Sequence, residues 1–195
     1  MYHPVEGDAF DANLKPVLDL WDDVHEYVEI YNASNARIKL TNWKLDGGVS
    51  YSFPTNSFID AGQYRVIAKD KPRLASIPQY GLKESDLFGP YKGTLGNQND
   101  RVQIKDASGA IVDAVAYSAE FPWAGCADAM GAGAAWTGYD EKAVNYRGRS
   151  LERVSFTHPA WDPANWLASP YPGEPTPGKA NNVQKSKPDS IVVSL

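Results

Sequence analysis

Residues 26–53 read EYVEIYNASNARIKLTNWKLDGGVSYSF, and this stretch decides the fold. Apolar and polar side chains alternate along short runs in it: Val28 and Ile30 flank Glu29, and the same two-residue period returns further along. That period is typical of β-strands with one buried face. The AspGlyGly at 46–48 supplies a turn, since Gly accepts the positive φ angles of tight hairpins. The stretch therefore predicts short antiparallel strands of a β-sandwich.

Outside this stretch the same punctuated pattern continues in both directions. Asp70 and Pro72 are suited to the N-cap and the first turn of a short helix over 71–78. Leu14, Val17, Leu18 and Trp21 recur at helical spacing and predict another short helix in the acidic segment 6–23. Further strands are expected at 64–69, 89–95, 101–105, 111–117 and 150–156, and a Gly/Ala-rich loop at 121–149, longer than a compact sandwich needs.

Size and charge limit the function classes. With 195 residues, 43% of them hydrophobic, the chain fits one domain with a sizeable core. The net charge of −5 and the absence of a basic cluster argue against nucleic acid as a partner. No apolar run reaches the ~18 residues of a membrane helix, so no transmembrane segment is expected. A single cysteine, Cys126, cannot form an internal disulfide.

Two groups of residues are candidate sites. Trp123, Trp136 and Tyr139 in the long loop suit a binding surface, because exposed aromatic rings stack on sugars or anchor proteins. The same rings suit a second role, in which they pin the loop to the sandwich. Asp19, Asp22 and Asp23 lie close together in the acidic segment, and carboxylate oxygens are hard ligands that can hold Ca²⁺. The alternative is that the acidic segment is exposed to solvent and binds no metal. No cofactor beyond this possible calcium ion is predicted.

Catalytic signals are absent from the sequence. The three histidines are far apart and match no metal-ligand spacing, and no GxSxG elbow is present. We therefore predict no catalytic residues and no enzyme activity. A metal-dependent hydrolase stays open only as an alternative, which would need acidic and histidine side chains brought together by the fold.

Seven segments, taken in order, resemble the lamin tail domain, and the bacterial, secreted versions are more similar than the nuclear ones. MYHP at 1–4 also resembles the end of that domain's first strand. The seven segments are EYVEIYN at 26–32, LTNWKLDGGVSYSFP at 40–54, IDAGQYRVIAKD at 59–70, residues 87–117, GRSLERV at 148–154, DPANW at 162–166 and TPGKAN at 176–181.

This resemblance implies an all-β, immunoglobulin-like antiparallel β-sandwich with short helical insertions and one long loop. The expected domain covers 1–181, and 182–195 is a linker or the start of a following segment. The expected function is a non-catalytic interaction, adhesion or spacer module of a larger secreted or cell-surface bacterial protein. A carbohydrate-binding accessory domain is the alternative. The partner, protein or glycan, is not identified by the sequence, and self-association through an edge strand is possible because the first strand is cut short.

Overall fold

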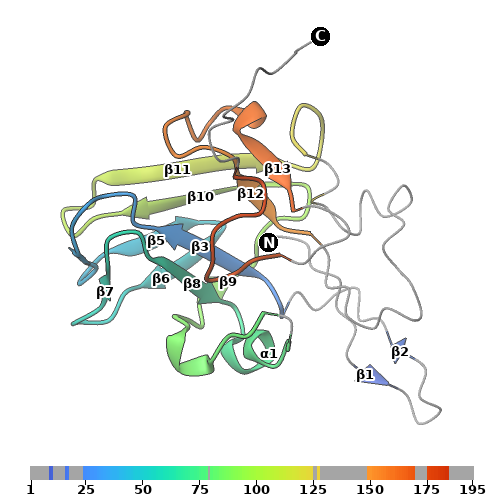
Figure 1. The fold of residues 1–195 in the computed structure, drawn as a ribbon, viewed down its shortest axis with the longest axis horizontal. Helices are drawn as coiled ribbons and strands as arrows, with labels where there is room; N and C mark the ends of the chain where they lie inside the picture. The colour runs from blue at the N-terminus through green and yellow to red at the C-terminus, as the bar shows by residue number, and fades with distance from the viewer. Residues whose placement is uncertain are drawn as a thin grey trace, which may run out of the picture.

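The computed structural model describes residues 24–78, 80–124, 127, 149–169 and 175–184, and the backbone of 9–10 and 16–17. Over these residues the strands form antiparallel sheets in two facing layers, with few helices (Figure 1). The expected all-β, immunoglobulin-like β-sandwich is therefore confirmed.

One layer is a five-stranded sheet with the strand order β11-β10-β5-β6-β9. Antiparallel pairing joins all neighbours, and the hairpin from β10 to β11 is the longest paired segment. Its strands are β5 (Lys44–Gly47), β6 (Val49–Ser52), β9 (Lys92–Gly93), β10 (Asn99–Lys105) and β11 (Ile111–Ser118).

The facing layer consists of separate two-stranded ribbons. They are β3 (Tyr27–Tyr31) with β8 (Tyr64–Ala68), β4 (Ile38–Lys39) with β7 (Phe58–Ile59), and β12 (Leu151–Arg153) with β13 (Trp166–Ala168). A further short ribbon pairs β1 (Ala9–Phe10) with β2 (Pro16–Val17). Three short helices complete the described elements: α1 (Lys71–Ala75), η1 (Glu84–Asp86) and η4 (Pro163–Asn165).

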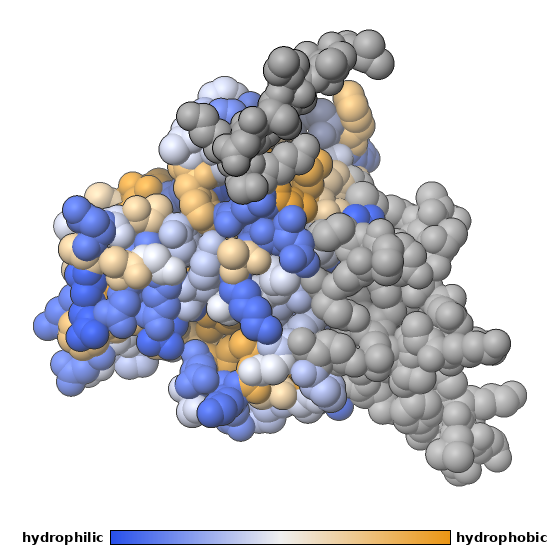
Figure 2. All heavy atoms as spheres, viewed as in Figure 1, coloured by the Kyte–Doolittle hydropathy of each residue, from blue (hydrophilic) through white to orange (hydrophobic). Residues whose placement is uncertain are grey.

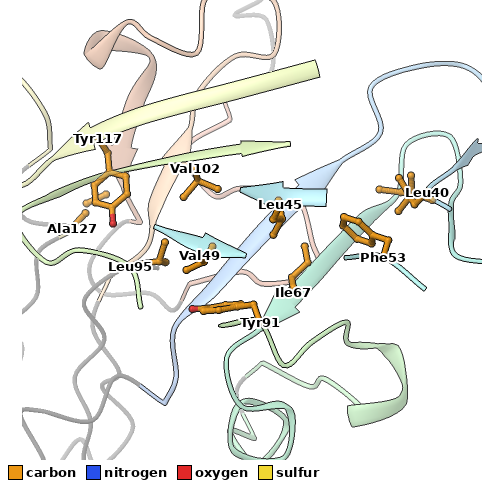
Figure 3. Close-up of a cluster of buried hydrophobic side chains, with 12 residues drawn as sticks. Leu40, Leu45, Val49, Phe53, Ile67, Tyr91, Leu95, Val102, Tyr117 and Ala127 are labelled. Atoms are coloured by element: carbon orange, nitrogen blue, oxygen red, sulfur yellow. The ribbon is translucent and has the colours of Figure 1, made fainter. Parts of the chain in front are cut away.

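The core lies between the two layers (Figure 3). Leu45, Val49 and Val102 enter it from the five-stranded sheet, and Ile67 enters from β8. These side chains come from alternate strand positions, as the two-residue period predicts. A second, smaller cluster covers the opposite face of the β3–β8 ribbon and includes Leu74 of α1. The β3–β8 ribbon therefore has protein on both of its faces.

Two turns of the five-stranded sheet, including the one predicted at 46–48, depend on particular residue types. Gly47 has a φ of +121°, and a Cβ there would collide with the carbonyl oxygen of Arg101 on the neighbouring strand. At the β10–β11 turn, the Asp106 carboxylate accepts hydrogen bonds from the backbone N–H groups of Ser108 (2.8 Å) and Ala110 (3.0 Å). Both turns therefore need the residue types that the sequence places there.

Strand β3 is anchored at both ends. The fully buried Glu26 carboxylate accepts hydrogen bonds from the Tyr91 hydroxyl (2.9 Å) and the Leu95 backbone N–H (3.1 Å), and lies 3.6 Å from the Lys69 ammonium. At the other end, the buried Asn32 side chain donates to the Ile59 carbonyl at 3.1 Å. Buried polar groups with such defined partners fix the position of the strand.

The predicted helix over 71–78 is confirmed over Lys71–Ala75 as α1, with Asp70 accepting from the Arg73 backbone N–H as its cap, and it ends three residues earlier than expected. The helix expected around Val17 is wrong at the residues described, because Pro16–Val17 form a strand. Proline lacks the N–H that a helix interior needs. β7 and β13 were not predicted, because two or three residues are too few to show a periodic pattern.

We expect Ile67→Ala to lower the free energy of unfolding by about 2–5 kcal/mol, because it leaves a cavity at a fully buried core position. Urea denaturation measures the change. Ile111→Ala is the matched control, since Ile111 is 51% exposed and its truncation should cost less than about 1 kcal/mol. Equal losses in the two variants would contradict the core described above.

Candidate binding cleft

A cleft of about 570 Å³ opens between strand β3 and strand β12. All five residues of β3 line it, and Ser150 to Arg153 line the facing wall. Inside, it continues to apolar core side chains such as Ile38, Val102 and Val115. Its volume is in the range of roughly 300–1,000 Å³ typical of ligand pockets. The cleft is therefore large enough to admit another molecule into the sandwich.

The backbone of β3 leaves hydrogen-bonding groups toward the cleft. Lys69 N–H donates to the Glu26 carbonyl and Asn32 N–H donates to the Gln63 carbonyl, so the even-numbered residues of β3 bond to β8. In an antiparallel pair the intervening residues direct their N–H and C=O groups the other way. For Glu29 and Tyr31 that direction is the cleft.

Strand β12 presents a matching edge. Ser169 N–H donates to the Ser150 carbonyl and Val154 N–H donates to the Asn165 carbonyl, so residues 150, 152 and 154 bond toward β13. Leu151 and Arg153 therefore direct their backbone groups away from β13. The Asn181 side chain satisfies the Arg153 carbonyl at 3.0 Å. Within the described residues, the two strands that line the cleft pair with β8 and β13 but not with each other.

Two carboxyl groups stand on the outer face of the cleft. The side chains of Val28 and Ile30 pack against the core, so Glu29 points to the opposite face of β3. Leu151 likewise packs against the core, which places Glu152 on the outer face of β12. A hydrogen bond between Tyr27 and Ser150 joins the same faces of the two strands. Glu29 and Glu152 therefore flank the opening from opposite sides.

Burial changes the acidity of both groups. It raises the pKa of the Glu29 carboxyl from 4.5 to about 8, against the opposing effect of a hydrogen bond from the Gly178 backbone N–H. Burial also raises the pKa of the Glu152 carboxyl, opposed by the Ser150 hydroxyl, which donates at 2.9 Å. Glu152 raises the pKa of Glu29 further by repulsion. Desolvation therefore outweighs the effects that lower the pKa of each carboxyl, which include the positive charge of the chain's amino terminus.

A segment at 175–184 crosses the same face and is held by both carboxyl groups. Gly178 donates its backbone N–H to Glu29, and Val183 donates its own to Glu152 at 3.4 Å. The Tyr64 hydroxyl donates to Gln184 at 3.3 Å. Thr176 and Asn181 of this segment belong to the cleft wall. The segment thus ties β3, β8 and β12 together at the cleft.

Aromatic rings form one end of the cleft. Tyr31 lies between Tyr64 and Phe156, with ring centroids 4.4 Å apart in both pairs. All three residues line the cleft. Stacked rings of this kind give a rigid, apolar wall.

The predicted loop aromatics are only partly within the described residues. Trp123 is partly buried, packs against the core, and has its ring centroid 6.3 Å from that of Trp166. Trp136 and Tyr139 lie outside the described residues, as do Asp19, Asp22 and Asp23. The binding role of these residues therefore stays a prediction.

In the described part of the chain, no three His, Cys, Asp or Glu side chains are grouped so that they could hold a metal ion. None of its helices is long and apolar enough to span a membrane.

Sequence reasoning missed Glu29 and Glu152. Each alternates with apolar neighbours in its strand, which is the pattern of an ordinary solvent-facing residue. They are separated by 122 other residues, and only the folded arrangement of β3 beside β12 brings them to one opening. No residue pattern within either strand indicates that β3 and β12 lie side by side in the fold.

The fold and the cleft define a β-sandwich module with an open strand edge. A comparison with protein-family models matches residues 7–119, more than half of the 195-residue chain, to the lamin tail domain. The chain belongs to the lamin tail domain family, whose members are non-catalytic, immunoglobulin-like modules. A search of curated proteins finds no match. The match includes β3 but ends before β12, so one wall of the cleft lies outside the matched range.

We expect Trp123→Ala to lower the free energy of unfolding by about 1–3 kcal/mol, because it removes a ring packed against Trp166 and the core. Thermal and urea denaturation measure this effect. Phe121→Ala is the control, since Phe121 is 94% exposed. Unchanged stability of the Trp123 variant, together with lost binding to an oligosaccharide panel, would instead favour a ligand-binding role.

We expect the stability of the protein to fall as the pH rises from about 4.5 to about 8, because over this range the unfolded chain loses the Glu29 proton while the folded chain retains it. Glu29→Gln removes this titration. Its stability relative to the wild type should therefore rise between about pH 5 and about pH 8. Urea denaturation at a series of pH values measures the difference, and a difference that does not change with pH would contradict the burial of Glu29.

Proposed function

We propose that this chain is a non-catalytic interaction module that takes an extended segment of a partner protein into the cleft between β3 and β12. The observation that carries this proposal is the pair of open strand edges on the two walls of the cleft. A strand inserted there would bond to Glu29 and Tyr31 on one side and to Leu151 on the other. Strand addition to an open edge is a common mode of peptide recognition.

The edge of the five-stranded sheet at β11 is less suited to this role. β11 is an edge strand, but its pairing with β10 is irregular beside Ile104 and Lys105, and its Asp113 forms an ion pair with Arg153 at 2.8 Å. A bulge and a charged side chain are features by which proteins protect sheet edges from pairing. Among the described residues, the edge of β3 at Glu29 and Tyr31 has apolar core beside it and neither of these features. This contrast favours the cleft as the place of association.

Apolar residues also reach the surface close to the cleft. Figure 2 shows hydrophobic residues exposed around β13, where Leu167 is 46% exposed, and Trp161 in the preceding loop is 74% exposed. Exposed aromatic and aliphatic side chains beside a cleft provide additional contact area for a protein partner. They support binding of a folded partner around an inserted strand.

The alternative functions have less support from the described residues. A glycan-binding role depends on Trp136 and Tyr139 and stays a prediction. A metal-dependent hydrolase has no support from the described side chains. Placement in a larger secreted or cell-surface bacterial protein is part of our proposal and is supported by the similarity of the sequence to the secreted bacterial domains.

A peptide of about eight residues, in which valine alternates with threonine, should bind the protein as an added strand. Glu29→Pro should weaken this binding at least about tenfold, because it removes the N–H that points into the cleft while leaving the bonds from Val28 and Ile30 to β8. Fluorescence anisotropy of the labelled peptide measures the affinity. Glu29→Gln is the matched control, since it keeps this N–H and should retain binding of the neutral peptide.

Three results would contradict the proposal. Binding unaffected by Glu29→Pro would place the peptide elsewhere. Binding seen only after deletion of residues 1–8 would mean that the chain's own amino-terminal segment is the occupant. Concentration-dependent dimers in analytical ultracentrifugation that Glu29→Pro abolishes would identify a second copy of the chain as the occupant instead.

A further inference from the structure

A second pocket, of about 370 Å³, lies between β7, β8 and the segment 85–88. Its walls come from four parts of the chain: Arg37, residues 56–58 with Asp60, Arg65, and residues 85–88. It shares no lining residue with the cleft between β3 and β12. Its volume is in the range typical of small-ligand sites. The pocket is therefore a second place at which this chain can hold a ligand.

Two arginine side chains line this pocket, and each lies against an aromatic ring. The guanidinium carbon of Arg65 is 5.8 Å from the centre of the Phe88 ring, and that of Arg37 is 5.6 Å from the centre of the Phe58 ring. Attraction between a cation and an aromatic face holds the guanidinium over the ring, while its N–H groups point outward in its own plane. The two rings therefore position both cations at the pocket.

The register of β8 explains why Arg65 lies beside the core. Arg65 is paired with Ile30 across the ribbon and precedes Ile67 by two positions, so all three side chains leave the same face. Ile30 and Ile67 pack in the core on that face, and Phe88 lies beside Ile67 through a short bridge between their strands. The aliphatic stem of Arg65 therefore runs along apolar surface, and its guanidinium reaches the pocket.

The two arginines differ in their partners. Arg37 forms an ion pair with the Asp60 carboxylate. The Arg65 side chain forms no ion pair or hydrogen bond with any residue that the structure describes, and its Nε atom is buried without an acceptor there. Taking a charged donor out of water without giving it an acceptor costs free energy. An anion in the pocket would supply the acceptor that the Arg65 guanidinium lacks.

The other charges around the pocket restrict the kind of anion. Asp60 and Asp86 line the pocket together with the two arginines, so its formal charges cancel. A doubly charged phosphate would be repelled by Asp86 more strongly than a singly charged group. A carboxylate carries one negative charge, and its two oxygens match the fork of one guanidinium. Asn56 and Ser57 line the same pocket and add polar side chains that can donate hydrogen bonds.

We propose that this pocket binds a carboxylate, held by paired hydrogen bonds from the terminal nitrogens of Arg65. The carboxylate belongs to a peptide carboxyl terminus or to a small organic acid, which share this chemistry. The site is independent of the proposed strand-binding cleft, because the two have no lining residue in common. The chain then has two binding sites, one that recognises the backbone of a strand and one that recognises a charge.

The probe for this site is acetyl-dialanine, a short peptide with a free carboxylate, and its carboxamide is the neutral control. NMR of the nitrogen-15-labelled protein follows the backbone N–H signals of Ser57 and Phe88 in the pocket wall. The carboxylate should shift these signals along a saturating curve at roughly millimolar concentration, and the carboxamide should leave them unshifted. Arg65→Gln should weaken binding at least about tenfold, because it removes both the charge and the fork.

Arg101→Gln is the matched control. It makes the same change in net charge at an exposed arginine of β10 that does not line the pocket, so its affinity for acetyl-dialanine should equal that of the wild type. Thermal denaturation checks that each variant is folded. If Arg65→Gln does not fold, Arg65→Lys replaces it. Lysine keeps the charge and the aliphatic stem but lacks the fork, so it should weaken binding at least about threefold.

Affinity that is unchanged in the Arg65 variants would overturn this inference, as would equal shifts with the carboxamide. Tighter binding of inorganic phosphate than of acetyl-dialanine would overturn it too. Propionate separates the two sources of the carboxylate: equal affinity for propionate and the peptide supports a small organic acid, and tighter binding of the peptide supports a carboxyl terminus. Arg65→Gln should still bind an amidated valine–threonine peptide in the cleft, so failure at one site leaves the other proposal standing.

Discussion

The register of β3 against β8 controls both the core and the cleft. It directs Val28 and Ile30 inward and Glu29 outward, and it leaves the backbone of Glu29 and Tyr31 facing β12. A slip of one residue would exchange the two faces, burying a carboxyl in the core and exposing the aliphatic residues. The structure prevents this slip at both ends of the strand, through Glu26 and Asn32. Each is a buried polar group whose bonds would be lost in any other register.

One wall of the cleft lies within the residues matched to the lamin tail domain, and the other wall lies outside them. Strand β3 belongs to the matched range, whereas β12 and the segment at 175–184 follow it. The core residue Leu151 holds β12 against the sandwich, and this packing brings Glu152 to the opening. Burial raises the pKa of both carboxyls at this opening, and Glu152 raises that of Glu29 further.

Much of the fold was predictable because its signals are local. The alternation in β3, β5, β6 and β8 predicts strands, and the AspGlyGly at 46–48 predicts the turn between β5 and β6. The strands β7 and β13 were missed because two or three residues carry no readable period. The helix expected from the spacing of Leu14 to Trp21 was wrong at Val17, where pairing with β1 prevails over the helical pattern. The aromatic pair of Trp123 and Trp166 joins residues too distant in sequence for a pattern to reveal.

The sequence by itself determined that this chain folds as an antiparallel β-sandwich of the lamin tail domain family, since alternation and turn residues act over a few neighbouring positions. The alternation also indicated which apolar side chains of β3, such as Val28 and Ile30, face the core. Only the tertiary structure decided that β12 lies beside β3 without pairing to it, and that Glu29 and Glu152 flank one opening. The physical reason is that packing between distant segments, together with the burial that raises a carboxyl pKa, depends on the whole three-dimensional arrangement.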